Sequence, residues 1–412
     1  MKLLVYGINF APELTGIGKY TGEMVAWLTA QGHEVRVVTA PPYYPDWAVW
    51  PAYSASRYAR EDWHGAMVIR TPLWVPRKVT GLRRLLHLGS FALTSIPALL
   101  AQWKWKPDVV WVTEPPLFCS PAALAFARLR SAKAWLHIQD YEVDAAFELG
   151  LLKGARLRSL VTSVERGLMR RFDRISTISL RMRERASSKG IDEARLVSLP
   201  NWANVSGIRP LSAESPYRAE LGIASDAVVA LYSGNMGAKQ GLETLAETAS
   251  ALAGRPELQF VFCGNGAGRA ELMRRCEKLS NVRFLDLQPR ERLGDLLGLA
   301  DIHLLPQRAD AADLVMPSKL TGMLSSGRPV VAGARPETEL GQVASRCGIA
   351  VAPDDPAAFA AAVVSLASQP ELRRELGLTA RRYAEERFDR DAVLKQFEQD
   401  LVACVNGSGS GG

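Results

Sequence analysis

The sequence contains few cysteines, and none of them forms a Cys-x-x-Cys pair. Five scattered cysteines in 412 residues, an odd number, indicate neither a disulfide framework nor a zinc site, and they fit a reducing compartment best. A secretory leader is not expected either. Residues 1–10 contain one lysine, a short apolar run and no small-residue cleavage site before Pro12.

Motifs of several catalytic classes are also missing. There is no Gly-x-Ser-x-Gly elbow, no His-Glu-x-x-His motif and no ordered Cys–His pair. The five histidines lie far apart in the sequence, so no metal site is expected. No helix-turn-helix or RNA-binding signature occurs, so nucleic acid is not an expected partner.

One long segment lacks acidic residues altogether. Between Trp63 and Pro107 there is no Asp or Glu, whereas seven basic residues occur there, as many as the net charge of +7. These residues are Arg70, Arg77, Lys78, Arg83, Arg84, Lys104 and Lys106. A local basic surface attracts phosphate groups, which belong to nucleic acid, an anionic lipid or a diphosphate substrate.

The remaining composition is that of an ordinary globular protein. Hydrophobic residues make up 48% and charged residues 23% of the chain, which excludes disordered, collagen-like and disulfide-scaffold classes. At roughly 100–200 residues per domain, the length suggests two domains of about 200 residues each.

Short apolar segments alternate with helical segments in both halves of the chain. This pattern is typical of parallel strands that helices cover on both faces, so we expect an α/β fold. Strands are expected at 2–8, 34–39, 66–70, 108–113, 134–139, 174–177 and 196–199, and again at 227–232, 259–263, 283–285, 302–305, 330–332 and 349–352. Helices are expected at 18–31, 82–103, 121–130, 157–171, 242–252, 269–279, 290–299, 319–326 and 357–368.

The alternation restarts after a turn-rich stretch at 200–216, which holds three Pro, two Asn, three Ser and a Gly. We therefore expect domains at 1–200 and 201–381, with a flexible tail at 406–412. Two doubly wound domains facing across a cleft would place their ligands at the carboxyl ends of both sheets.

Two glycine-rich loops follow expected strands in the second domain. The loop 233–241 has the strand–loop–helix form that presents backbone N–H groups and a helix dipole to a phosphate, and Lys239 adds a cation. The segment 263–266 repeats this form one strand later. The candidate phosphate-binding residues are Gly234, Asn235, Lys239, Gly264 and Gly266.

A third glycine pair, Gly16 and Gly18, follows the first strand and opens a helix. The pair fits neither the dinucleotide fingerprint nor the Walker pattern, so a phosphate contact and a plain turn are both open.

Lys319 enters a later helix, where a cation opposes the dipole and an anionic ligand would explain its position. A solvated lysine is the alternative.

The segment 137–140 ends an expected strand. Asp140 is well placed for a cleft, and the alternative is a helix cap. His137 points to the opposite face, and the alternative for it is a hydrogen-bonded core residue.

Residues 85–101 are uncharged but too short to span a membrane. With basic flanks, Trp103 and Trp105, this segment either lies at a membrane interface or packs on its own sheet.

These residues carry a resemblance to the retaining glycosyltransferases of the GT-B fold, family 4. The chain is most similar to the colanic-acid and exopolysaccharide biosynthesis branch, which includes a fucosyltransferase-like member. The motifs are 10–20, 135–140 (Trp-Leu-His-Ile-Gln-Asp), 199–202 (Leu-Pro-Asn-Trp), 233–235 (Ser-Gly-Asn), 239–243 (Lys-Gln-Gly-Leu-Glu), 304–307 (Leu-Leu-Pro-Gln) and 317–319 (Pro-Ser-Lys).

The resemblance implies a hexosyltransferase that uses a GDP- or UDP-linked sugar, with GDP-fucose as one candidate, and a polyprenyl-diphosphate-linked glycan acceptor. It implies no metal and no organic cofactor, and a cytoplasmic enzyme held peripherally at the inner membrane. Asp140 and His137 are expected to be catalytic, with Asp140 facing the reacting sugar and His137 nearby. A helix at 382–405 would cross back onto the first domain. The residues expected around the donor are Gly16, Gly18, Gly234, Asn235, Lys239, Gly264, Gly266, Gln288, Ser318 and Lys319, the last of them also catalytic.

Two departures from the family pattern bear on the donor. Family members often carry Arg and Lys where this chain has Asn235 and Gln240. The two glutamates of the family's Glu-x7-Glu pattern would fall near Leu314 and Gly322, where this chain has no acid. The second glutamate normally holds the donor ribose, and Asp310 and Asp313 are the candidates to replace it. A nucleotide-sugar epimerase and a non-catalytic nucleotide-sugar or polysaccharide-binding subunit therefore remain as alternatives.

Overall fold

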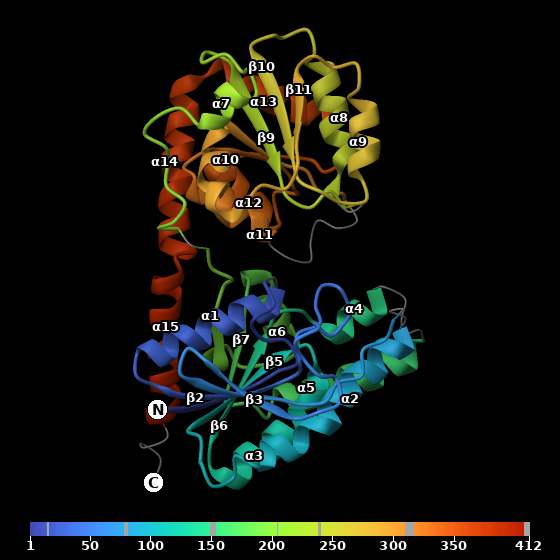
Figure 1. Ribbon diagram of the computed structural model, residues 1–412, viewed down its shortest axis with the longest axis vertical. Helices are drawn as coiled ribbons and strands as arrows, with labels where there is room; N and C mark the ends of the chain where they lie inside the picture. The colour runs from blue at the N-terminus through green and yellow to red at the C-terminus, as the bar shows by residue number, and fades with distance from the viewer. Residues whose placement is uncertain are drawn as a thin grey trace. The chain divides into compact units, whose positions relative to one another are not determined.

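The computed structural model describes residues 1–14, 16–77, 81–148, 154–203, 205–237, 240–309 and 317–407. The chain forms two compact units. Unit 1 consists of Met1–Pro200 and the segment from Leu394 onward, and unit 2 of Asn201–Val393. Each unit is a sheet with helices on both faces (Figure 1), so the expected α/β class is confirmed.

Unit 1 contains an eight-stranded sheet in the order β3-β4-β2-β1-β5-β6-β7-β8. The strands are β1 (Lys2–Tyr6), β2 (Glu34–Thr39), β3 (Ala59–Trp63), β4 (Ala66–Arg70), β5 (Val109–Glu114), β6 (Lys133–Ile138), β7 (Arg174–Thr177) and β8 (Leu196–Ser198). All neighbours are parallel except β3, which pairs antiparallel with β4. We did not expect β3, because its residues are polar and largely exposed at the sheet edge.

The helices of unit 1 pack on both faces of this sheet. They are α1 (Gly16–Ala30), α2 (Gly81–Leu100), α3 (Ser120–Arg130), α4 (Glu142–Glu148), α5 (Ala155–Met169) and α6 (Leu180–Ser188), with short 3-10 turns at Leu117–Cys119 and Glu193–Arg195. Tyr6 of β1, Phe91 of α2 and Phe126 of α3 belong to one buried cluster. That cluster covers one face, and period-two alternation along the strands sends Trp135 of β6 to the other.

The chain returns to unit 1 through its last helix, α15 (Arg390–Asn406). The ring of Phe397 packs edge-on against Trp135 at 5.4 Å, and Glu398 Oε1 lies 2.7 Å from His33 Nε2. The segment 382–405, expected as one helix, holds the end of α14 (Pro370–Arg387) and most of α15. Helix α15 includes Asn406, and residues 408–412 of the expected tail lie outside the described residues.

Unit 2 contains a six-stranded parallel sheet in the order β11-β10-β9-β12-β13-β14. The strands are β9 (Val228–Ser233), β10 (Leu258–Cys263), β11 (Val282–Leu285), β12 (Ile302–Leu305), β13 (Val330–Gly333) and β14 (Gly348–Val351). Besides α14, the helices are α7 (Pro216–Glu220), α8 (Leu242–Ala251), α9 (Arg269–Arg275), α10 (Leu293–Leu299), α11 (Ser318–Ser325), α12 (Glu339–Cys347) and α13 (Pro356–Ser368), with a 3-10 turn at Arg290–Arg292.

The strand orders fix where each unit can bind a ligand. In unit 2 the chain runs outward from β9 to β11 and then returns to place β12 on the other side of β9. In unit 1, β1 lies in the same way between β2 and β5. A crevice forms at such reversal points, at the carboxyl ends of the strands, because successive loops leave in opposite directions.

Candidate active site

The two glycine-rich loops of unit 2 lie side by side because β9 and β10 are neighbours. The N–H of Gly234 donates to the carbonyl of Cys263 at 3.0 Å. The N–H of Met236 donates to the carbonyl of Asn265 at 2.9 Å. The loops therefore continue the pairing of their strands and form one backbone surface at the carboxyl edge of the sheet.

These loop positions require glycine for two reasons: a Cβ atom would overlap the neighbouring backbone, and the φ angles are positive. A Cβ on Gly264 would lie 2.0 Å from the carbonyl oxygen of Gly234, and one on Gly266 would lie 2.6 Å from the carbonyl of Met236. The φ angles of Gly234, Gly264 and Gly266 are 142°, 138° and 153°, which L-residues rarely adopt. Three of the predicted residues are thus brought together, and Asn235 lies exposed on the same surface.

Lys319 extends toward the first of these loops from the first turn of α11. Its Nζ donates to Gln240 Oε1 and, at 3.2 Å, to the hydroxyl of Tyr232. The position of a Cβ on Gly234 would be only 3.5 Å from Lys319 Cδ. Burial lowers the pKa of Lys319 to about 8. The structure therefore joins the predicted lysine to the predicted glycine loop.

Tyr232, which the sequence did not single out, links this lysine to the loop. Its hydroxyl accepts from Lys319 and donates to the carbonyl of Asn235 at 2.6 Å. The lysine Nζ also lies 4.6 Å from the centre of the Tyr232 ring. The sequence feature that could have pointed to Tyr232 is its position, two residues before the glycine of a loop that follows a strand.

Gln307 is a second residue that the sequence did not assign to the site. It follows β12 at the reversal point, and its backbone lies within 3.3 Å of the Cβ positions of Gly241 and Gly333. Its side-chain Oε1 is buried and has no hydrogen-bond partner among the described residues. A buried amide oxygen without a donor costs about 1–3 kcal/mol, so this acceptor is free for a ligand.

The other predicted residues of unit 2 are less informative. Gln288 uses its amide within the unit, accepting from the Tyr217 hydroxyl and donating to the Asp286 carbonyl, both at 2.8 Å. Ser318 is the first residue of α11. The predictions on Lys239, Asp310 and Asp313 lie outside the described residues.

The glycine pair of unit 1 packs against a buried carboxylate. Gly16 has a φ of 59°, and a Cβ on Gly18 would lie 2.6 Å from Glu13 Oε2. Glu13 is 2% exposed, and its Oε1 accepts from the N–H groups of Tyr43 and Tyr44 at 3.0 Å. Burial raises the pKa of Glu13. Close packing on Glu13 therefore accounts for glycine at position 18.

His137 and Asp140 have opposite environments. His137 is buried, with Nδ1 2.8 Å from Ser176 Oγ and Nε2 2.9 Å from the side-chain nitrogen of Gln139. Its ring stacks on Trp111 at 5.2 Å. Burial lowers the pKa of His137 to about 3, so the imidazole is neutral at physiological pH. Asp140, two residues beyond β6, is exposed.

A buried glutamate at the end of β5 was not predicted. Glu114 is 0% exposed, and neither carboxylate oxygen has a hydrogen-bond partner among the described residues. Burial, and then the charges of Glu165 and Glu142, raise the pKa of Glu114 well above its ordinary value. Within the described ranges, no three His, Cys, Asp or Glu side chains come together as a bound metal ion would require.

Comparison with known proteins identifies the family. A model of the glycosyl transferase 4-like domain matches residues 15–202, and one of glycosyl transferases group 1 matches residues 227–369. The chain is 46% identical over 409 residues to WcaI of Escherichia coli K12, a glycosyl transferase assigned to colanic acid biosynthesis. That match covers 97% of this chain and 100% of WcaI.

Solved structures agree on the fold. Sucrose-phosphate synthase of Thermosynechococcus elongatus has a TM-score of 0.72 at 17% identity, covering 98% of this chain and 99% of its own. Alr3699/HepE of Anabaena, solved with UDP, has a TM-score of 0.71 at 14% identity, covering 98% and 100%. The chain therefore belongs to the glycosyltransferases that combine a 4-like and a group 1 domain, and its two parallel-sheet domains have the GT-B fold.

Proposed function

We propose that the chain transfers a sugar, with retention, from a nucleotide sugar to a lipid-linked oligosaccharide during assembly of a colanic-acid-like exopolysaccharide. The donor is GDP- or UDP-linked, with GDP-fucose as one candidate. The observation that carries the proposal is the 46% identity to WcaI over the whole of that protein. A neighbour in fold, HepE, was solved with UDP and with UDP-glucose, which supports a nucleotide-sugar donor.

We place the donor diphosphate at the carboxyl edge of the unit 2 sheet. A diphosphate leaving group gains negative charge as the glycosidic bond breaks, and fixed cations and N–H groups stabilise that charge. Lys319 supplies the cation, held by Gln240 and Tyr232. The start of α11 and the backbone of the glycine loops supply the positive dipole and the donors. The buried Oε1 of Gln307, to which no described residue donates, would accept a hydrogen bond from an N–H or hydroxyl of the donor.

We assign Asp140 and His137 different roles on the acceptor side. Asp140 is an exposed carboxylate beyond β6 and would face the reacting sugar. The neutral His137 is instead a positioning residue, because its two nitrogens bond to Ser176 and Gln139. In a retaining transfer the leaving phosphate itself takes the acceptor proton on the same face of the sugar, so neither residue has to act as a strong base.

The first experiment identifies the donor class by thermal unfolding with GDP, UDP, ADP and dTDP, each free and sugar-linked. A ligand at 100 times its Kd adds about 2.7 kcal/mol of stability, which moves the melting temperature visibly. We expect one nucleotide family alone to stabilise the wild type and to lose most of this effect in Lys319→Ala. Stabilisation by none of them would contradict a nucleotide-sugar enzyme.

Turnover of the identified donor separates the proposal from its rivals. A transferase consumes the labelled donor only when a lipid-linked glycan is present and moves the label to lipid. An epimerase would convert the donor without acceptor, and a binding subunit would leave it unchanged. Either of the last two outcomes would contradict the proposed transfer.

We further propose that unit 1 binds a membrane surface peripherally through α2. The inner face of α2 packs in the core through Leu88, Phe91 and Leu99. The helix therefore covers its own sheet, which was one of the two alternatives for this segment. Its outer face carries leucines at a helical spacing that are more than half exposed: Leu82, Leu86, Leu93 and Leu100. No helix in the described part of the chain is long and apolar enough to cross a membrane.

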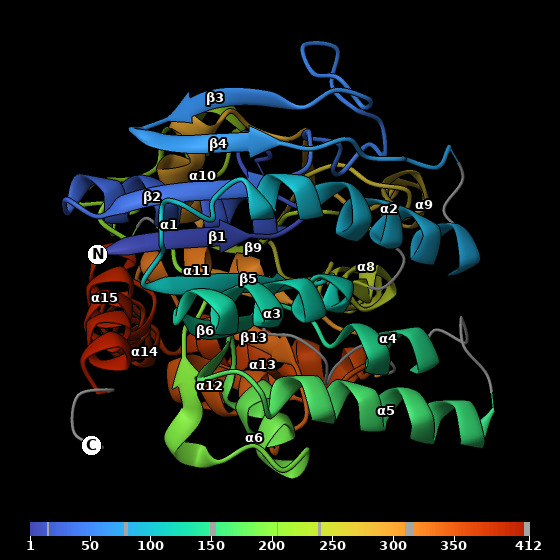
Figure 2. The same ribbon diagram turned by 90° about the horizontal axis from the view of Figure 1, so that it is seen from below.

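Helix α5 carries a second set of exposed apolar residues at helical spacing, Leu157, Leu160 and Val164. Figure 2 shows α4 between α2 and α5, so the two sets are separate on unit 1. Arg83 and Arg84 at the start of α2 add positive charge. Such a combination of apolar and basic residues is typical of interfacial helices.

Two expectations about this surface are wrong. Trp105 is 7% exposed, with the Arg36 guanidinium 4.5 Å above its ring, so it is not available to lipid as Trp103 is. Arg70 is also buried, and its Nε donates to Glu61 at 2.8 Å. The segment without acidic residues therefore contributes less positive charge to the surface than its composition suggested. Glu61, which neutralises Arg70, lies just before the segment in the sequence.

Vesicle cosedimentation tests the proposed membrane surface. We expect binding to anionic vesicles that falls with salt, since each nearby Lys or Arg contributes about 1 kcal/mol. The double change Leu86→Ser and Leu93→Ser should reduce binding, whereas the control Val402→Ser on α15 should not. Equal binding by both variants would contradict the α2 face. Full binding to neutral vesicles in high salt would contradict the electrostatic contribution.

A further inference from the structure

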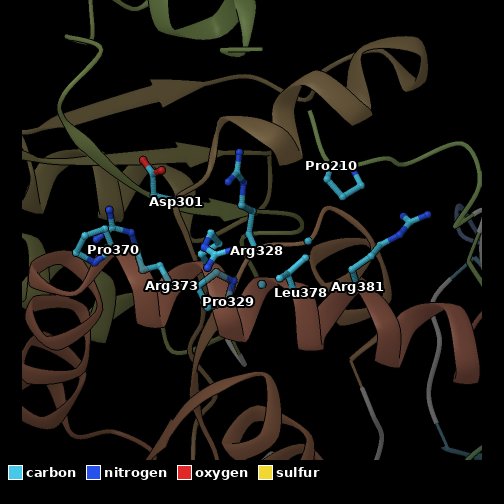
Figure 3. Close-up of a pocket in the computed structure, with 11 residues that line it drawn as sticks. Pro210, Asp301, Arg328, Pro329, Pro370, Arg373, Leu378 and Arg381 are labelled. Carbon is cyan, nitrogen blue, oxygen red and sulfur yellow. The ribbon is translucent and has the colours of Figure 1, made fainter. Parts of the chain in front are cut away.

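An arginine-lined pocket lies at the edge of the unit 2 sheet opposite to the glycine loops. It occupies about 400 Å³ beside the residues that precede β12 and β13 and along one side of α14 (Figure 3). The lining residues are Pro210, Asp301, Gly327, Arg328, Pro329, Pro370, Arg373, Arg374, Gly377, Leu378 and Arg381. This volume is within the range of small-molecule sites, and none of these residues belongs to the candidate active site.

The charges in this pocket are strongly unbalanced. Among the described residues, four arginines and one carboxylate, that of Asp301, line it, while Glu371 and Glu385 outside the lining pair with Arg374 and Arg381. Asp301 Oδ2 is already engaged outside the pocket, since it accepts from Arg218 Nη2 at 2.8 Å and from the N–H of Val229 at 2.9 Å. It therefore does little to neutralise the arginines that face the cavity.

Two of the four arginines are held in position by backbone carbonyls. Arg373 Nη1 donates to the carbonyls of Leu366 and Ala367 at 2.6 Å. Arg381 Nη1 donates to the carbonyl of Ser325 at 2.7 Å, and its Nε pairs with Glu385. These bonds orient the side chains along α14. The carbonyls leave the charge of Arg373 uncancelled, whereas Glu385 offsets that of Arg381.

Arg328 has no such support. Figure 3 shows its side chain in the middle of the pocket, between Asp301 and Pro210. Within the described ranges it has no hydrogen-bond acceptor and no carboxylate at ion-pair distance, and its Nε is buried. A buried charged donor without an acceptor is more costly than a neutral one. The guanidinium therefore has donors available for an anion that enters the pocket.

We propose that this pocket binds a small phosphorylated metabolite, a sugar phosphate or a nucleotide. A single carboxylate would need one bidentate arginine, whereas four guanidinium groups match the dianionic charge and several acceptor oxygens of a phosphoryl group. The rings of Pro210, Pro329 and Pro370 and the side chain of Leu378 provide apolar walls for the remainder of the ligand. The site is separate from the donor site and does not depend on the donor proposed above.

Titration with inorganic pyrophosphate at constant ionic strength tests the proposal. The titrations use full-length protein carrying Lys319→Ala, which removes the cation of the candidate active site. In that background we expect pyrophosphate to bind with a measurable Kd. Arg328→Gln should weaken the binding about tenfold or more, the size expected for one charge-assisted bond. The control Arg255→Gln, which removes an exposed arginine elsewhere in unit 2, should leave Kd unchanged.

A second variant keeps the test valid if Arg328→Gln folds poorly. Arg374 is 72% exposed, and its ion pair in the described part of the chain is with Glu371 at 3.1 Å, so Arg374→Gln should fold normally and still weaken the binding. Equal affinity of both variants and the control would overturn the proposal, as would no binding at all in the Lys319→Ala background. Binding of glucuronate as tightly as pyrophosphate would overturn the phosphoryl class.

Discussion

The carbonyl oxygen of Gly234 lies 2.0 Å from the point at which a Cβ of Gly264 would stand. The two residues directly follow neighbouring strands, β9 and β10, and the N–H of Gly234 donates to the carbonyl of Cys263, the residue just before Gly264. The contact is between two backbones, so no change of rotamer can relieve it. The shape of the candidate donor site therefore depends on the absence of a side chain at position 264.

Gly264→Ala should destabilise unit 2 by about 2 kcal/mol or more, since the new methyl overlaps backbone and φ is positive. Urea unfolding with and without the stabilising nucleotide measures both stability and binding. Gly254→Ala is the control, because its Cβ would meet no atom within 4 Å. A similar stability for the two variants would contradict the packing argument.

Lys319→Ala should lower turnover at saturating donor roughly 10²-fold or more, the size of effect seen when a charge-stabilising donor is lost. We expect this loss because we place its ammonium beside the leaving diphosphate in the transition state. Steady-state transfer assays measure this effect, with the exposed Lys278→Ala as control. Unchanged turnover would remove Lys319 from the mechanism.

The affinity for a nucleoside diphosphate should fall as pH rises through about 8. Burial lowers the pKa of Lys319 to about 8 in the free protein, so the ammonium is present below that pH and lost above it. A bound anion favours the ammonium, and affinity should therefore fall by up to about tenfold per pH unit above 8. Calorimetric titrations between pH 7 and 9.5 test this. A wild-type profile as flat as that of Lys319→Ala would contradict it.

Glu114→Gln should stabilise unit 1 increasingly as pH rises. The folded-state pKa of Glu114 lies above the unfolded value, so its contribution to stability is greatest at low pH and is lost as pH rises through the folded pKa. Glutamine cannot ionise, so the difference should grow by up to about 1.4 kcal/mol per pH unit between the unfolded-state pKa and the folded-state pKa, and level off above the latter. Denaturant unfolding at pH 5, 7 and 9 measures it. The exposed Glu184→Gln on α6 is the control, and equal pH dependence in both variants would argue against a buried ionisation.

The strands were predictable because each buried parallel strand is a short run of Val, Ile and Leu. Strand β3 was not predicted because it lies at the edge of the sheet, where it pairs with β4 on one side. Its residues, such as Arg60 and Asp62, face solvent and form no apolar run. The first part of helix α14, residues 370–381, was also not predicted, because its sequence is rich in charge and its apolar positions are few.

The residues of the candidate site also divide into those that a local sequence pattern predicts and those that it does not. Gly234, Gly264 and Gly266 were predictable because a glycine-rich loop after a strand is a local pattern. Tyr232 and Gln307 were not, because their importance comes from burial and from partners more than 60 residues away in the chain, such as Lys319 for Tyr232. No local pattern in one sequence carries such long-range contacts.

The backbone contact between the two glycine loops also limits how selectivity for the donor can evolve. Neither Gly264 nor Gly266 can accept a side chain without moving the adjacent loop, so mutation cannot easily add a contact to base or sugar there. New specificity has to arise at positions with room for change, such as Gln307 after β12 or the residues after β11. An engineer who wishes to exchange the donor should leave both loops intact and build libraries at those strand ends.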